Sequence, residues 1–325
     1  MRAAGHIRPA PRQEGECAMQ AREELFAQIE ELKAQKDAVI LAHYYTDDDV
    51  QNVADYVGDS FGLSKLAAEL PCKTLVFAGV HFMGESAKLL SPDKTVLLPA
   101  PDADCPMAHM VDPAFVRQVR EEYQDLAVVC YVNSTAETKA LSDVCVTSSN
   151  ALKVVGALPQ KNILFVPDKH LGRFVSEQLP EKNFILNPGY CPIHDAVQAQ
   201  EVADLKTAYP QAMILAHPEC GPEVLALADY AGSTAGIIKQ VAASDLQDFI
   251  IVTVEGIACQ IRKETEGSGK RLHFPATTPR CTDMDKITLE GIRNALRDGL
   301  GEVSLPDESC CERARASLVR MLELS

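Results

Sequence analysis

At 325 residues, with 46% hydrophobic and 24% charged side chains, the chain has the composition of a globular protein with a sizeable core. Its formal net charge of −15 argues against nucleic acid or an anionic membrane as a partner, because both favour a basic surface. No apolar run approaches the roughly 20 residues of a spanning helix and none follows the basic start, so we expect a cytoplasmic protein without a membrane anchor.

The first predicted elements form a leader and one α/β unit. Residues 1–22 combine Pro, Gly and mixed charge, which predicts a flexible leader. An apolar strand follows at residues 39–43, a helix starts within residues 46–51, another follows residues 59–60, and a second apolar strand covers residues 73–79. This alternation predicts parallel strands covered by helices on both faces.

The same pattern recurs twice along the chain. Residues 129–133 and 214–217 match the first strand of this unit, and residues 162–168 and 249–255 match the second. The repeat therefore predicts an α/β fold of three similar parallel-sheet βαβ domains around a pseudo-threefold axis with a central active site. The expected boundaries divide the chain into 1–22, 23–112, 113–200 and 201–325.

Each unit carries an aspartate that is followed, five residues later, by a hydroxyl. The pairs are Asp55 with Ser60, Asp143 with Ser148, and Asp229 with Thr234. A hydroxyl beside the free N–H groups of a helix N-terminus can bind a carboxylate or phosphate. A single Ser or Thr before a helix is more often an N-cap, but the constant offset favours a shared binding role.

Other polar side chains lie where the first strand of each unit ends. They are His43, Tyr45, Tyr131, Asn133, His217 and Glu219. In parallel sheets, functional groups gather at the carboxyl ends of the strands, so we expect these side chains to face one crevice. A lone histidine at a strand end is more often structural, and duplication of a fold alone could also produce the repeat.

Each unit also contributes one cysteine at the same place. Lysines 88 residues apart open the last strand of each unit, and the turns that follow carry Cys105, Cys191 and Cys281. None of the eleven cysteines forms a Cys-x-x-Cys pair, which argues against a disulfide framework and a zinc ribbon. Structural zinc needs four protein ligands, whereas a [4Fe–4S] cluster on three cysteines leaves one iron open as a Lewis acid for loss of water.

Several stretches resemble the quinolinate synthase family, the A protein of NAD biosynthesis. They are residues 41–45, 102–108, 131–137, 188–194 and 217–220, and the resemblance runs from about residue 25 to about residue 322. It implies the three-domain fold and a [4Fe–4S] cluster on Cys105, Cys191 and Cys281. It also implies condensation of iminoaspartate with dihydroxyacetone phosphate to quinolinate, phosphate and two waters. The chain lacks the Cys-x-x-Cys that some members have near the third cysteine, so thiol–disulfide control is not expected.

The resemblance also implies roles for individual residues. The substrate-binding set would be Ser60, Ser148 and Thr234, which would hold carboxylates or phosphate, with hydrogen bonds added by His43, Asn133 and His217. The set around the reacting carbons would be Tyr45, Tyr131, His194 and Glu219. Of these, Glu219 is the expected general base and Tyr45 the expected proton donor or shuttle. Iminoaspartate is short-lived, so transient contact with an aspartate-oxidising enzyme is chemically reasonable, although no motif supports it.

Two other classes of protein stay open. One is a redox or structural metalloprotein in which Cys220 or His194 completes a four-ligand site on the same three thiols. The other is a metal-free α/β protein that binds a sugar phosphate or carboxylate, with its cysteines in the core.

Overall fold

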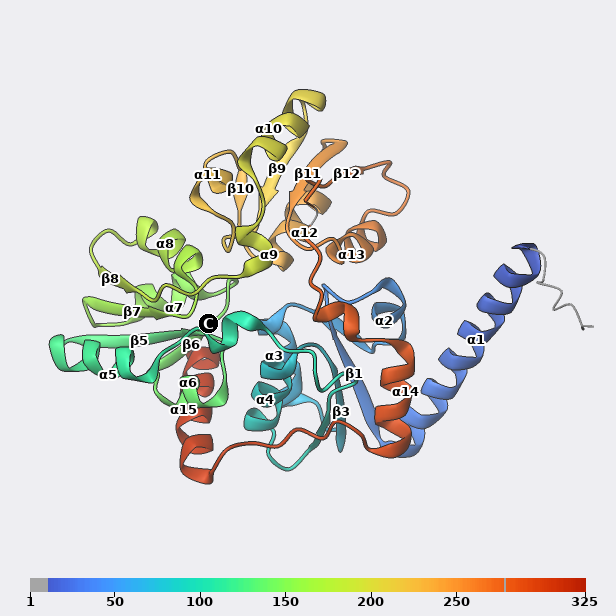
Figure 1. Ribbon diagram of the computed structural model, residues 1–325, viewed down its shortest axis with the longest axis horizontal. Helices are drawn as coiled ribbons and strands as arrows, with labels where there is room; N and C mark the ends of the chain where they lie inside the picture. The colour runs from blue at the N-terminus through green and yellow to red at the C-terminus, as the bar shows by residue number, and fades with distance from the viewer. Residues whose placement is uncertain (1–10, 278) are drawn as a thin grey trace, which may run out of the picture.

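The computed structural model describes residues 11–277 and 279–325. It contains three parallel four-stranded sheets, each flanked by helices, which form three lobes around a common centre (Figure 1). The predicted α/β fold of three similar parallel-sheet units is confirmed. No helix in these two ranges is long and apolar enough to cross a membrane.

In the first lobe, the sheet order is β2-β1-β3-β4. The strands are β1 (Ala38–His43), β2 (Tyr56–Gly58), β3 (Thr74–Ala78) and β4 (Thr95–Leu97). The helices are α1 (Pro11–Lys36), α2 (Asp48–Val53), α3 (Ser60–Glu69), α4 (His81–Leu90) and the 3₁₀ helix η1 (Pro106–His109). Of the expected flexible leader, residues 1–10 lie outside the described residues and residues 11–22 belong to α1.

The second lobe repeats this topology with the order β6-β5-β7-β8. Its strands are β5 (Leu126–Tyr131), β6 (Val144–Val146), β7 (Asn162–Val166) and β8 (Asn183–Leu186). Its helices are α5 (Pro113–Glu122), α6 (Ala136–Ala140), α7 (Ala151–Ala157), α8 (Lys169–Gln178) and α9 (Pro192–Asp195). The predicted strands at residues 129–133 and 162–168 correspond to β5 and β7.

The third lobe has the order β10-β9-β11-β12. Its strands are β9 (Met213–Ala216), β10 (Tyr230–Ala231), β11 (Asp248–Val252) and β12 (Arg271–His273). Its helices are α10 (Ala199–Ala208), α11 (Pro222–Leu225), α12 (Thr234–Ala243) and α13 (Ile257–Glu264). The apolar clusters of this lobe are separate from the large cluster that the first and second lobes share.

The chain beyond β12 leaves the third lobe and packs on the other two. After the 3₁₀ helix η2 (Met284–Lys286), helix α14 (Leu289–Asp298) contacts α1 and β3, and helix α15 (Glu308–Leu324) contacts α4, α6 and β6. Figure 1 shows both helices, in orange and red, away from the third lobe. The last part of the predicted unit 201–325 therefore joins the first and second lobes.

The repeated aspartates have a structural role. Each carboxylate accepts a hydrogen bond from a backbone N–H in the first strand of its lobe. The N–H of Ile40 donates to Asp55 at 2.8 Å, and that of Val128 donates to Asp143 at 2.7 Å. The third copy places Asp229 2.8 Å from the N–H of Ile214. Because each aspartate also donates its own N–H to the same strand residue, the start of the short second strand is fixed. This pairing sets the position of the hydroxyl that follows.

The repeated lysines bind carbonyl groups at the C-terminal ends of the helices that follow these hydroxyls. The Lys94 ammonium donates to the carbonyl oxygen of Ala67 at 2.6 Å, near the C-terminus of α3. Lys182 donates to the carbonyl of Leu158 at 2.7 Å, just after α7, and Lys270 to that of Ser244 at 2.6 Å, just after α12. A cation at a helix C-terminus satisfies carbonyls that have no partner within the helix and complements the helix dipole.

We expect Lys270→Met to lower the free energy of unfolding by about 1–2 kcal/mol, because the end of α12 loses its charged donor. The matched control is Lys239→Met, an exposed lysine on the same helix, which should change that free energy by less than about 0.5 kcal/mol. Urea denaturation of both variants measures the difference. Equal losses in the two variants would contradict the capping role.

Candidate active site

A cavity lies where the three lobes meet, and residues of all three line it. It has a volume of about 670 Å³, which includes its opening to solvent. The lining contains every predicted site residue: His43, Tyr45, Ser60, Cys105, Tyr131, Asn133, Ser148, Cys191, His194, His217, Glu219, Thr234 and Cys281. The structure thus brings the predicted set together, as the meeting of parallel strand ends requires, while the roles of its members stay predictions.

Two histidines at strand ends share one hydrogen-bonding arrangement at their Nδ1 atoms. The backbone N–H of Tyr45 donates to Nδ1 of His43 at 3.2 Å, and that of Glu219 donates to Nδ1 of His217 at 3.3 Å. Burial lowers the pKa of His43 to about 4 and that of His217 to about 3, so both rings are neutral at pH 7. With Nδ1 occupied as an acceptor, the hydrogen of each neutral ring lies on Nε2, which is a hydrogen-bond donor.

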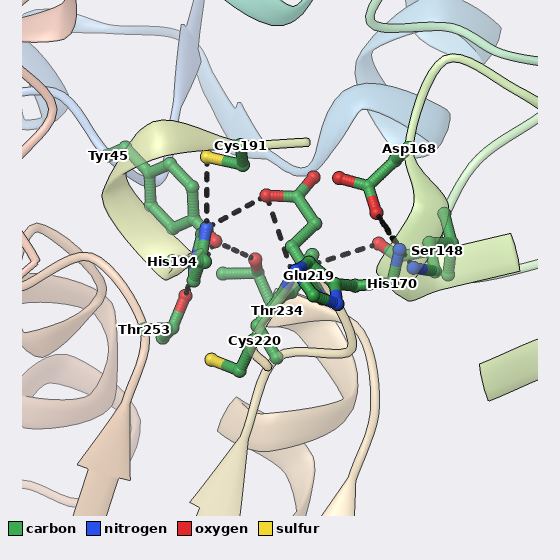
Figure 2. Close-up of polar contacts among 12 residues, drawn as sticks. Tyr45, Ser148, Asp168, His170, Cys191, His194, Glu219, Cys220, Thr234 and Thr253 are labelled. Atoms are coloured by element: carbon green, nitrogen blue, oxygen red, sulfur yellow. Dashed lines mark hydrogen bonds and ion pairs between the residues drawn. The ribbon is translucent and has the colours of Figure 1, made fainter. Parts of the chain in front are cut away.

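The carboxylate of Glu219 is buried among donors from the second lobe. The Tyr131 hydroxyl donates to Oε1 at 2.7 Å. Nδ1 of His194 lies 2.8 Å from Oε2, a contact that Figure 2 shows. Burial alone would raise the pKa of Glu219, but the hydrogen bonds from His194 and Tyr131 lower it overall. Glu219 is therefore ionised at neutral pH.

The two tyrosines of the cavity are held in their protonated form. Burial, reinforced by the charge of Glu219, raises the pKa of Tyr45 and of Tyr131 well above the ordinary value. The Tyr45 hydroxyl lies 2.9 Å from Oγ1 of Thr234 and 2.7 Å from Oγ1 of Thr253. Tyr45 thus joins the first lobe to the third and remains a phenol that can donate a proton.

The three repeated hydroxyls are not helix caps. The cap of α3 is Asp59, which accepts the N–H of Gly62 at 2.9 Å, and the cap of α12 is Ser233, which accepts the N–H of Gly236 at 3.1 Å. The N-cap position of α7 belongs to Asn150. The capping interpretation of Ser60, Ser148 and Thr234 is therefore wrong; the Ser148 hydroxyl lies 3.2 Å from Nε2 of His217, and that of Thr234 contacts Tyr45.

The three predicted thiols occupy one region of the cavity wall, each at or just before a short helix. Cys105 and Cys191 are the N-cap residues of η1 and α9, and Cys281 comes shortly before η2. All ten cysteines whose side chains are described are free. Among the described residues, the groups whose ligand atoms lie within 4.8 Å of one another include Cys191 with His194 and Glu219 but not the three thiols together.

The distances between the three sulfur atoms can be compared with those that a metal site requires. Two thiolates on one zinc ion lie no more than about 4.6 Å apart, since each Zn–S bond is about 2.3 Å. At least one pair of the three sulfur atoms lies further apart than this, so the thiols as placed do not form a three-thiolate site for one zinc ion. The suggested fourth thiol, Cys220, is outside the cavity lining and donates to the carbonyl of Val252 instead. In Figure 2 its sulfur lies well apart from that of Cys191.

Sequence reasoning missed two residues that support the site. Thr253, fully buried, contacts both Tyr45 and Nε2 of His194, the latter at 2.9 Å. Asp168, also fully buried, caps α8 by accepting the N–H groups of His170 and Leu171, each at 2.8 Å. Both follow the second strand of their lobe. The rule that functional side chains gather at the carboxyl ends of parallel strands identifies both residues when it is applied to the second strand of each lobe.

Comparison with known proteins agrees with this geometry. The family model described as "Quinolinate synthetase A protein" matches residues 27–323. A quinolinate synthase of Fusobacterium nucleatum is 51% identical over 91% of this chain and 98% of its own length. A quinolinate synthase of Clostridioides difficile is 47% identical over 93% of this chain and 98% of its own length. One of Aquifex aeolicus is 41% identical over 98% of this chain and 100% of its own length.

The cap assignment predicts different costs for two adjacent substitutions. Asp59→Ala should lower the free energy of unfolding by about 1 kcal/mol, because the first turn of α3 loses its acceptor. Ser60→Ala should change it by less than about 0.5 kcal/mol, because its hydroxyl caps nothing. Thermal or urea unfolding distinguishes the two. A loss in Ser60→Ala as large as that in Asp59→Ala would restore the capping interpretation.

Proposed function

The chain belongs to the quinolinate synthase family, and on this premise we propose that it condenses iminoaspartate with dihydroxyacetone phosphate to give quinolinate, phosphate and water. We further propose that it does so with a [4Fe–4S] cluster on Cys105, Cys191 and Cys281. One observation carries this proposal: the three thiols and the polar strand ends of all three lobes line a single cavity. Contact with an aspartate-oxidising enzyme and a cytoplasmic location stay predictions of the sequence.

The cavity suits anionic substrates although its described lining contains no lysine or arginine. Carboxylates and phosphate would accept hydrogen bonds from the hydroxyls of Ser60, Ser148 and Thr234. A further donor would be the Nε2–H group of His43, whereas that of His217 donates to Oγ of Ser148 at 3.2 Å and orients this hydroxyl. A hydrogen bond to a charged group contributes about 1.5–3 kcal/mol, so several neutral donors together can hold an anion without a cation. Ser60 and Thr234 also begin α3 and α12, whose N-termini favour negative charge.

The cluster would be held by three residues from three lobes or their connecting turns. Their spacing exceeds what one zinc ion spans, and His194 with Glu219 already forms a hydrogen bond, so the protein offers the cluster three ligands. When bound, such a cluster supplies a Lewis acid that assists the loss of water. Buried apolar side chains beside the thiols, among them Val80 and Met284, would keep bulk water from it.

Proton transfer is assigned to Glu219 and the two tyrosines. Ring formation requires removal of protons from carbon and nitrogen, and the ionised Glu219 carboxylate can accept them. His194 orients this carboxylate through Nδ1, while its Nε2 contacts Thr253. Tyr45, kept protonated by burial, would donate from its hydroxyl to a leaving group. Its contact with Thr253 offers a route by which that proton is replaced.

We expect Cys105→Ala, Cys191→Ala and Cys281→Ala each to abolish activity and the broad visible absorption of the anaerobically purified enzyme, because each removes a cluster ligand. Cys220→Ala, which removes a buried thiol outside the cavity, is the matched control and should leave iron content, colour and activity intact. Full iron and sulfide in Cys191→Ala would overturn the assignment. A colourless Cys220→Ala would instead favour a four-ligand metalloprotein.

We expect Glu219→Gln to keep a full cluster and to bind quinolinate, but to lose about 10²–10⁴ in turnover rate, the usual effect of removing a general base. The variant keeps the size and hydrogen-bonding reach of the side chain. Glu223→Gln, an exposed residue of α11, is the control and should turn over normally. Steady-state rates with measured iron content test this. Near-normal turnover in Glu219→Gln would transfer the base role to Tyr45 or His194.

A further inference from the structure

The three predicted cluster ligands lie on three separate turns, and one of these turns contacts both of the others. We call residues 102–110, which carry Cys105 and include η1, the first ligand turn. Residues 187–191, between β8 and α9, are the second, and residues 281–286, which include η2, are the third. Thiols from separate turns can hold one cluster only if the turns keep fixed relative positions, so the contacts between the turns support the ligands.

Asn187 links the second ligand turn to the first. Its side chain is buried, with 1% exposed, and its amide nitrogen Nδ2 donates to two carbonyl oxygens. One carbonyl, at 2.8 Å, belongs to Pro167 of the second lobe, and the other, at 2.9 Å, belongs to Met110 at the end of η1. An amide nitrogen carries two hydrogens, so this one side chain satisfies a carbonyl on each side of the junction.

The backbones of the first and second ligand turns approach closely beside this amide. A Cβ at Gly189 would lie 2.6 Å from the carbonyl oxygen of Pro167 and 2.9 Å from both Nδ2 of Asn187 and Cβ of Met110. Only glycine allows this approach without displacing one of the three groups. Cys191 comes two residues later, so the contact that Asn187 makes also sets where the second ligand turn begins.

Asp283 links the third ligand turn to the opposite end of the first. Its Oδ1 accepts the backbone N–H of Asp104 at 3.3 Å and lies 2.8 Å from Nζ of Lys286. The Lys286 ammonium also donates to the carbonyl oxygen of Asp102 at 2.8 Å. The carboxylate of Asp104 in turn accepts the N–H of Cys105 at 2.8 Å. Asp283 therefore binds the residue that directly precedes and orients a predicted ligand.

We propose that Asn187 and Asp283 are positioning residues that fasten the second and third ligand turns to the first, so that the three thiols stay in place for the cluster. Asn187 acts at Met110, five residues after Cys105, and Asp283 acts at Asp104, the residue before it. Neither side chain lines the cavity, so neither is a catalytic residue. The proposal rests on the proposed function in taking the three cysteines as cluster ligands.

Asn187→Asp tests the fastening of the second ligand turn without changing the size of the side chain. An ionised carboxylate has no hydrogen to donate, so its oxygen would face two carbonyl oxygens. Release of iron from the anaerobically purified enzyme to a ferrous chelator should become about tenfold faster or more. Asn183→Asp, at an exposed position of β8, is the matched control and should release iron at the native rate.

Equal release rates in Asn187→Asp and Asn183→Asp would overturn the role of Asn187. If Asn187→Asp does not fold, Asn187→Ala is measured against Asn183→Ala by the same standard. Asn187→Ala also lacks the donor and leaves both carbonyls without it, so it too should release iron about tenfold faster.

Asp283→Ala tests the third ligand turn. It removes the acceptor of the Asp104 N–H and should make iron release about threefold faster or more, a smaller effect because this junction is less buried. Asp285→Ala is the control, since Asp285 belongs to the same turn but its carboxylate binds Arg280 at 2.7 Å. A native rate in Asp283→Ala, or the same acceleration in Asp285→Ala, would contradict the role of Asp283.

Hydrogen exchange measures the fastening itself, independently of iron chemistry. In full-length chains brought to equal iron content, zero included, peptides covering residues 105–111 and 187–195 should exchange faster in Asn187→Asp than in Asn183→Asp. Identical exchange in the two variants would show that the turns are not fastened by Asn187. A native protein that binds no iron would count against the proposed cluster, whereas the exchange rates would still decide whether Asn187 holds the turns together.

Discussion

The buried carboxylate of Glu219 sets the electrostatics on which the rest of the cavity depends. Its charge adds to burial in raising the pKa of Tyr45, Tyr131, Cys105 and Cys191, so in the protein alone these groups stay protonated around one anion. Glu219 itself is ionised only because His194 and Tyr131 donate to it. One carboxylate and two phenols are therefore kept in opposite protonation states at the same pH, which the acid–base roles proposed for them require.

The same contacts join the third lobe to the others. The first and second lobes share one apolar cluster that α15 completes, whereas the buried clusters of the third lobe are separate from it. Contacts across this boundary include the bonds of Tyr45 to Thr234 and Thr253, and a 3.0 Å bond from Gln51 to the carbonyl of Gly256. A Cβ at Gly256 would lie 2.8 Å from the backbone of Tyr45, so this close approach requires glycine. Polar groups of the site thus also help to align the lobes.

Much of this arrangement could be predicted from the sequence because the repeat and the strand-end rule are both local patterns. Apolar runs locate the strands, and parallel strands direct their polar ends to one edge, so the residues that meet in the cavity could be named without coordinates. The packing of α14 and α15 could not be predicted, because the apolar face of an amphipathic helix does not specify which lobe it packs against. Cys310 and Cys311 illustrate this: both lie in the first turn of α15 and are buried, at 6% and 9% exposure, although no local pattern distinguishes them from exposed residues of that turn.

A local pattern also fails where neighbouring residues divide two roles. The sequence presents Asp59-Ser60 and Ser233-Thr234 as pairs of equally good caps, and only the backbone direction at the first turn decides which side chain caps and which faces the cavity. The outcome matters for binding. Because the preceding residue caps the helix, the hydroxyl of Ser60 or Thr234 does not have to bind the backbone N–H groups of the first turn. His43 and His217 stay neutral down to about pH 4 and pH 3, so these two side chains do not change charge near neutral pH. Neutral, pre-oriented donors of this kind suit the anion binding proposed for the cavity, in a protein whose net charge of −15 offers anions no general attraction.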